Sequence, residues 1–101
     1  PSDVVNVTER EFEREVIRSE IPVLIEFSAE WCAPCKQIAP EVAAFAREMQ
    51  GKVKVVKVDI DKSPTLAREL RIQSVPVSLR HLQRIHRNVR SEHFAPALER
   101  D

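Results

Sequence analysis

Residues 23–36 read VLIEFSAEWCAPCK, and the character of the chain changes half-way along this stretch. The first five residues, Val23–Phe27, are apolar except for Glu26 and rich in strand-forming side chains. That composition predicts a central β-strand covered on both faces. Beyond the cysteines, apolar residues recur at helical spacing, which predicts a helix over Pro34–Met49 with a kink at Pro40. The stretch therefore indicates a buried strand that leads directly into a helix.

Cys32 and Cys35 are the only cysteines of the chain. A secreted domain of this size held by disulfides usually carries four or more, so the pair does not indicate such a framework. At the start of a helix, Cys32 faces unpaired backbone N–H groups and the positive end of the helix dipole. Both favour the thiolate, which is the form that attacks a disulfide. The pair therefore indicates thiol–disulfide exchange.

The rest of the chain alternates between helical and extended patterns. Thr8 and Glu11 form a capping box, which marks the start of a helix. The further elements expected are a helix over Glu9–Ser19, a buried strand over Lys52–Asp61, a helix starting at Ser63-Pro64, and an extended stretch over Val75–Leu79. Strands that alternate with helices predict an α/β domain whose early strands are parallel.

Length and composition exclude several classes of protein. The chain has 101 residues, 43% hydrophobic and 32% charged, which fits a single domain over residues 1–101 and excludes wholesale disorder. Sixteen basic side chains balance sixteen acidic ones, so no net field attracts nucleic acid or an anionic membrane. No apolar run approaches the roughly 18 residues of a membrane-spanning helix, and the N-terminus shows no leader pattern. We expect a cytoplasmic monomer without nucleic-acid or membrane partners.

Beyond residue 79 the pattern is less regular. Apolar residues follow neither a strand nor a helix period, and no Asn-Gly or Asp-Gly pair marks a tight hairpin. Ser91 could cap a short last helix, although Pro96 fits poorly inside one. The segment is rich in basic residues and histidine: Arg80, His81, Arg84, His86, Arg87, Arg90 and His93.

Several landmarks together resemble the thioredoxin family. They are Ser28–Lys36, Pro40, Asp59-Ile60-Asp61 and Val75-Pro76, and the spacing between them holds without gaps over about residues 1–79. The resemblance implies a thioredoxin-like fold, with a central mixed sheet flanked by helices. The turn and the late glycine typical of the family are missing, so an altered or reduced C-terminal hairpin is expected.

The resemblance also implies roles for the residues that carry the chemistry. Cys32 would be the exposed nucleophile and Cys35 the buried resolving thiol. Glu26 stands where the family has a buried aspartate that handles the proton of the resolving cysteine, and Lys57 matches the lysine paired with that carboxylate.

A second group of residues is expected to contact the substrate. Trp31 would form part of a flat apolar surface around the nucleophile, together with Ala33 and Pro34; Ala33 replaces the usual glycine. Pro76 would be a cis proline beside the disulfide. The backbone of Val75 would pair with the bound substrate chain.

Less specific interpretations exist for each of these residues. The cysteines could form a structural disulfide, or bind zinc together with His81 and His86. However, 45 residues separate Cys35 from His81, against about 12–15 in a zinc finger. Trp31 could simply cover the core, and the basic segment could bind RNA or an acidic partner.

Two functions remain in view at this stage. The first is an enzyme, a protein disulfide reductase that acts on disulfide-containing proteins, is recycled by a reductase or a thiol pool, and needs no metal or organic cofactor. The second is a binding or adaptor module of thioredoxin fold with little redox turnover. Independently of this choice, Glu26 could be a buried ion-pair partner of Lys57 with no part in catalysis.

Overall fold

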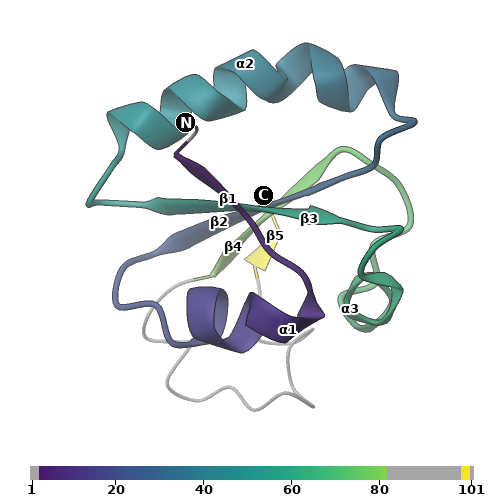
Figure 1. Ribbon diagram of the computed structural model, residues 1–101, viewed down its shortest axis with the longest axis horizontal. Coiled ribbons are helices and arrows are strands. Elements are labelled where there is room, and N and C mark those ends of the chain that lie inside the picture. The colour runs from purple at the N-terminus through teal and green to yellow at the C-terminus, as the bar shows by residue number, and fades with distance from the viewer. Residues whose placement is uncertain (1–2, 82–98, 101) are drawn as a thin grey trace.

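The computed structural model describes residues 3–81 and 99–100, and of residues 79–81 and 99–100 only the backbone. Figure 1 shows strands in the middle with helices on both sides. In chain order the elements are β1 (Val4–Asn6), α1 (Glu9–Phe12), the π-helix η1 (Glu13–Ile17), β2 (Val23–Ser28), α2 (Ala33–Glu48), β3 (Lys54–Asp59), α3 (Pro64–Glu69), β4 (Val77–His81) and β5 (Glu99–Arg100).

The strands form one mixed sheet in the order β1-β3-β2-β4-β5. Strands β1, β3 and β2 are parallel to one another, whereas β4 runs antiparallel to β2 and β5 antiparallel to β4. The α/β class, the parallel early strands and the central position of β2 are therefore confirmed. Helix α2 lies on one side of the sheet, and α1 and α3 lie on the other (Figure 1).

The two faces of the sheet differ in chemistry because side chains alternate along each strand. On the α1 and α3 side, Val23, Ile25 and Phe27 of β2 join Val56 and Val58 of β3 in the main apolar core. The other face, toward α2, carries polar residues at matching register positions: Asn6, Glu26, Ser28, Lys57 and Asp59. The chemistry of the molecule is therefore concentrated between the sheet and α2.

The first helix begins as predicted but ends earlier. Glu11 Oε1 accepts hydrogen bonds from the Thr8 N–H and hydroxyl, both at 2.8 Å, which completes the capping box. The helix then continues as η1 and ends at Ile17 instead of Ser19. The Ser19 hydroxyl donates to the Ile21 carbonyl and accepts from the Ile21 N–H, so a local turn replaces the last helical bonds.

Three of the strands also differ from the prediction. Strand β1 was not expected at all. Strand β4 begins at Val77 instead of Val75, because Pro76 has no N–H to donate to a neighbouring strand. Strand β3 ends at Asp59, two residues early, where the Asp59 carboxylate accepts the N–H groups of Asp61 and Lys62 and turns the chain.

The C-terminal part of the sheet is short where it is described. Strand β5 has two residues, and its Glu99 and Arg100 pair with β4. Residues 82–98 lie outside the described residues. The predictions made for His86, Ser91 and Pro96 fall within this range. The alternative zinc ligand His86 and most of the basic segment weighed as an RNA-binding alternative fall within these residues.

Candidate active site

The cysteine pair lies at the N-terminus of α2. Cys32 is the N-cap residue, and the Cys35 N–H donates to Cys32 Sγ at 3.1 Å. The two residues are joined by a disulfide, with their Cα atoms 5.3 Å apart. A sulfur that accepts a backbone N–H at the positive end of a helix is favoured as a thiolate once the disulfide is reduced. The local geometry thus agrees with the prediction that the position of Cys32 at the start of a helix favours its thiolate.

Both cysteines are buried to the same degree. Each is 3% exposed, and they pack together with Ala29 while Ile60 and Val75 cover the cluster. The expectation of an exposed Cys32 beside a buried Cys35 is therefore wrong for the disulfide form. The covering side chains come from the loop after β2, the turn after β3 and the segment before β4, which the local sequence around the cysteines does not reveal.

The surface beside the cysteines is apolar and open. Trp31 is 67% exposed, and its indole Nε1 donates to Asp61 Oδ2 at 2.8 Å. Trp31 therefore does not cover the core. Ala33 and Pro34, in the first turn of α2, are also exposed.

The segment before β4 completes this surface. The peptide bond between Val75 and Pro76 is cis, as the resemblance implied. Val75 is half-buried and packs against the cysteine cluster. The expected cis proline is confirmed, and its neighbour Val75 lies against the disulfide.

Glu26 lies on β2, on the face of the sheet toward α2, and is 2% exposed. Burial raises the pKa of its carboxyl above the usual 4.5, and the positive charge of Lys57 partly offsets this. Glu26 and Lys57 are directly opposed in register on β2 and β3, yet the described residues contain no ion pair between them. A structural salt bridge therefore does not explain the buried carboxylate.

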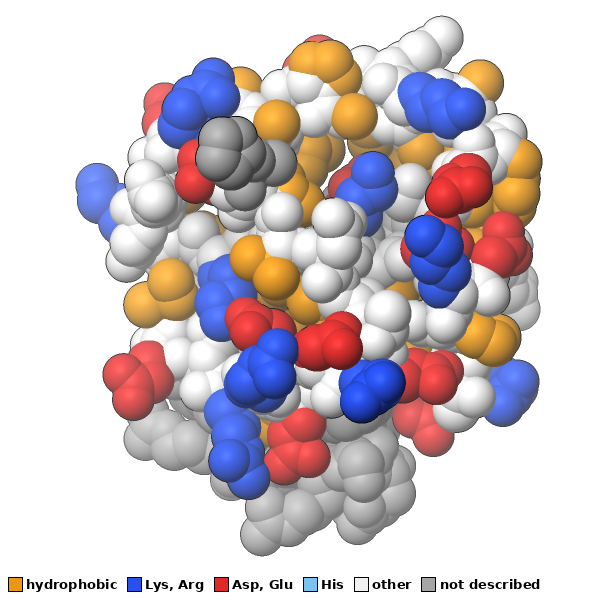
Figure 2. All heavy atoms as spheres, viewed as in Figure 1, with side chains coloured by type: hydrophobic (Ala, Val, Ile, Leu, Met, Phe, Trp, Pro, Cys, Tyr) orange, Lys and Arg blue, Asp and Glu red, His pale blue; other side chains and the backbone are white. Residues whose placement is uncertain are grey.

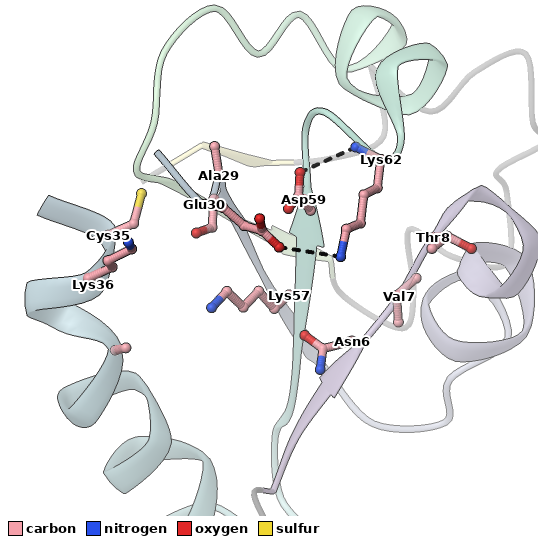
Figure 3. A pocket seen from close by; sticks show the side chains of 12 residues that line it. Asn6, Val7, Thr8, Ala29, Glu30, Cys35, Lys36, Lys57, Asp59 and Lys62 are labelled. Carbon is pink, nitrogen blue, oxygen red and sulfur yellow. Dashed lines mark hydrogen bonds and ion pairs between the residues drawn. The ribbon is translucent and has the colours of Figure 1, made fainter. Parts of the chain in front are cut away.

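Two adjoining pockets separate the sheet from α2. The larger, about 480 Å³, is lined by Cys35 but not by Cys32, and the smaller, about 290 Å³, is lined by Glu26. Asn6, Ala39 and Lys57 line both. Figure 2 shows a hollow with apolar walls on this face of the molecule, and Figure 3 shows Lys57 extending across the larger pocket toward the helix that carries Cys35. The two cysteines thus differ in surroundings, although the exposed fraction of each residue is the same.

Metal binding has no support within the described part of the chain. Among the side chains that the structure describes, those of residues 3–78, no group of three or more His, Cys, Asp or Glu could hold a metal ion. The thiolates that a zinc site would need are bonded to each other. In the same residues, no helix is both long and apolar enough to cross a membrane.

With this geometry established, comparison with known proteins identifies the family. A family model described as Thioredoxin matches residues 3–91. The chain belongs to the thioredoxin family. It is 46% identical over 71 residues to a thioredoxin of Rickettsia felis, a match that covers 70% of this chain and 68% of that protein.

Two further comparisons agree. Thioredoxin 1 of Nostoc sp. is 44% identical over 75 residues, covering 74% of this chain and 70% of that protein. Among solved structures, the chain is similar to the Trx4 domain of ERdj5, with a TM-score of 0.76, 29% identity, and coverage of 81% of this chain and 72% of that one. Thioredoxins exchange thiols and disulfides with protein substrates, and this chain carries the required pair. The protein is a thiol–disulfide oxidoreductase.

Several residues that shape this thioredoxin site were among the family landmarks of the sequence but were given no role at the site. Ala29 and Ile60 pack on the cysteines, Asp61 holds the indole of Trp31, and Ser28 and Lys36 line the larger pocket. One signal was available for Ser28. It lies two residues after Glu26 in the same strand, so alternation places both side chains on the face toward α2.

Proposed function

We propose that the protein reduces disulfides in other proteins, with Cys32 as the nucleophile and Cys35 as the resolving thiol. The observation that carries this assignment is the position of Cys32 Sγ as N-cap acceptor of α2, because it favours the thiolate at that sulfur. Cys35 lies within the helix and borders the larger pocket instead. The two sulfurs therefore suit different steps of one reaction.

The reaction has two exchange steps. The Cys32 thiolate attacks one sulfur of the substrate disulfide, forming a mixed disulfide and releasing the other substrate sulfur as a thiolate, which takes a proton from water. Cys35 then loses its proton, and its thiolate attacks Cys32 Sγ. The substrate leaves as its second thiolate, and the protein is left with the Cys32–Cys35 disulfide. Two electrons have moved from the protein to the substrate.

Glu26 is proposed as the acceptor of the Cys35 proton. Its buried carboxyl has a raised pKa, which brings it closer to the working pH and makes it a better base. The adjoining pockets give a route between the two groups, since Cys35 lines one and Glu26 the other, and three residues line both. Lys57, opposite Glu26 in register, would set the charge balance of the carboxylate.

Substrate binding is assigned to the surface around the cysteines. Trp31, Ala33 and Pro34 are exposed beside Cys32 and offer apolar area to a partner. The backbone of Val75, held next to the cis peptide of Pro76, is proposed to pair with an extended substrate segment.

The wider setting follows as part of the same proposal. A disulfide reductase with a single cysteine pair must be reduced again after each turnover, by a disulfide reductase or a thiol pool. We propose that the protein works as a cytoplasmic monomer in such an electron-transfer chain, with residues 1–101 forming one domain. The similarity to bacterial thioredoxins supports this setting.

The experiment that tests the proposal is covalent trapping. In Cys35→Ser, Cys32 can still attack, but the serine hydroxyl cannot resolve the mixed disulfide, so substrate complexes should accumulate in cell extract and dissolve on adding dithiothreitol. The double variant with Cys32→Ser and Cys35→Ser is the control and should retain nothing covalently. If the double variant retains the same proteins, binding is non-covalent and the adaptor function is correct.

A second variant tests the role of the buried carboxylate. Glu26→Gln should slow the reduction of insulin by about tenfold or more, because the amide cannot accept the Cys35 proton. The rate at which Cys32 reacts with iodoacetamide should stay nearly the same. Unchanged turnover in Glu26→Gln would show that the carboxylate has no part in the chemistry.

A further inference from the structure

The larger pocket beside Cys35 lies at the carboxyl ends of three parallel strands. Its lining includes the last residue of each of them: Asn6 of β1, Ser28 of β2 and Asp59 of β3. Open α/β sheets commonly bind ligands outside the carboxyl ends of their strands. At about 480 Å³ the pocket is also within the range of small-molecule sites.

Some polar side chains of the pocket already have a hydrogen-bond or ion-pair partner among the described residues, and others do not. Lys62 Nζ lies 3.6 Å from Glu30 Oε2, and Asp59 Oδ1 accepts the N–H groups of Asp61 and Lys62, as Figure 3 shows in part. These carboxylates and this lysine therefore already have partners.

The side chains without such a partner can all donate hydrogen bonds. The ammonium groups of Lys36 and Lys57 have no hydrogen bond or ion pair with any described residue, and the side chains of Asn6 and Ser28 have none either. Ser28 is the least exposed member at 4%, and its hydroxyl has no hydrogen-bond partner in the described part of the chain. That hydroxyl is not sealed inside the protein: among the described residues the fully buried side-chain atom without a partner is Ser63 Oγ, whereas Ser28 lines the pocket.

We propose that this pocket binds a small molecule through a single anionic group, a carboxylate or a phosphate, held by Lys36, Lys57 and the Ser28 hydroxyl. Two free ammonium groups and a hydroxyl suit the oxygens of either anion. A cation is disfavoured because both carboxylates of the wall already have partners.

The site would connect ligand binding to the redox reaction. Cys35 lines the same pocket, and Lys57 also borders the pocket of Glu26. A bound anion would occupy the space between the resolving thiol and its proposed base, so it should slow resolution of the mixed disulfide. This regulatory step rests on the proposed function, whereas binding itself does not.

Binding is tested on the oxidised protein by NMR titration of its amides. The probes are inorganic phosphate and propionate, each added at constant ionic strength against sodium chloride, so that the two anion chemistries are distinguished. At least one probe should give saturable shifts at Asn6, Ser28 and Lys57, with a Kd of about millimolar. No saturable shift with either probe would overturn the proposal.

Three variants test whether the anion binds in this pocket. Ser28→Ala and Lys36→Gln should each weaken binding by about fivefold, because each removes one donor to an anion. Lys52→Gln, at an exposed lysine outside the pocket, is the matched control and should bind like the unmodified protein. Lys36 is also exposed, so its variant remains informative if Ser28→Ala does not fold.

Equal affinity in all three variants would contradict the site. Insulin reduction by the unmodified protein, measured in parallel, separates the two proposals. A protein without reductase activity that still binds the probe would refute only the proposed function, and an active protein without binding would refute only the pocket.

Discussion

At the scale of single residues, the backbone at Arg71 is unusual. Arg71 follows α3 and has φ +60°, a left-handed conformation that L side chains rarely adopt. The Arg71 N–H donates to the Arg68 carbonyl and the Ile72 N–H to the Ala67 carbonyl, which is the Schellman pattern at a helix end. Glycine is the usual residue at this position because it has no Cβ to strain.

Arg71→Gly should therefore stabilise the protein. We expect the free energy of unfolding to rise by about 0.5–1 kcal/mol, since relief of backbone strain exceeds the extra entropy that glycine has in the unfolded chain. Urea unfolding at neutral pH measures this change. A less stable Arg71→Gly would show that the arginine side chain contributes more than its strain costs.

Gly51 provides the matched comparison. It has φ +86°, and a Cβ added there would meet no atom within 4 Å. Gly51→Ala should lower the free energy of unfolding by about 1 kcal/mol from backbone strain alone. Opposite signs for the two variants are the expected outcome.

The chemistry of a site residue could be predicted where it depends on residues nearby in the sequence. The spacing of Cys32 and Cys35 at the start of a helix predicted both the pair and its chemistry, and a lone acid in an apolar strand drew attention to Glu26. The equal burial of the two cysteine residues was not predictable. It depends on Ile60 and Val75, which are distant in sequence and reach the cysteines only after the sheet has formed.

At the scale of elements, a side chain of the sheet binds η1. Lys54 Nζ, on β3, donates to the Glu15 carbonyl at 3.0 Å and to Glu15 Oε1 at 3.1 Å. Hydrogen bonds from Arg14 and Lys54 lower the pKa of Glu15. The contact joins the first helical segment to the sheet near the end of the apolar core.

Lys54→Met should destabilise this junction while keeping the apolar stem of the side chain. We expect a loss of about 1 kcal/mol in the free energy of unfolding, because the partly buried carbonyl and carboxylate lose their donor. Lys52→Met, at an exposed lysine nearby in sequence, should change stability by less than about 0.5 kcal/mol. Equal losses in the two variants would mean that the Lys54 contact contributes nothing specific.

Elements were predictable from sequence in proportion to their length and apolar content. Strands β2 and β3 and helix α2 appear within one or two residues of their expected places. Strand β1 was missed because three residues carry too little pattern, and pairing of Val4 with Val55 is what makes them a strand. The start of β4 was misplaced because Pro76 interrupts the hydrogen bonding of an otherwise strand-like run.

At the scale of the whole molecule, the fold segregates its polar groups. One face of the sheet is packed with valine, isoleucine and phenylalanine, and the other carries the residues that adjoin the disulfide. The fold class was predictable from the alternation of strands and helices together with the family landmarks. The pockets were not, because their walls come from β1, β2, β3 and α2 at once.

This segregation should make global stability depend on pH through Glu26. Its pKa is raised above 4.5 in the folded protein, so the folded state keeps this proton over a range of pH in which the unfolded chain has lost it. The stabilisation is fully present below pH 4.5 and is lost as the pH rises through the higher folded value. Glu26→Gln cannot ionise and should be the more stable protein at pH 7–8, with the difference shrinking toward pH 4. Urea unfolding across that range measures it, with Glu41→Gln on the exposed side of α2 as control. If the difference in the free energy of unfolding stays constant with pH, the carboxyl of Glu26 has the same pKa in the folded protein as in the unfolded chain.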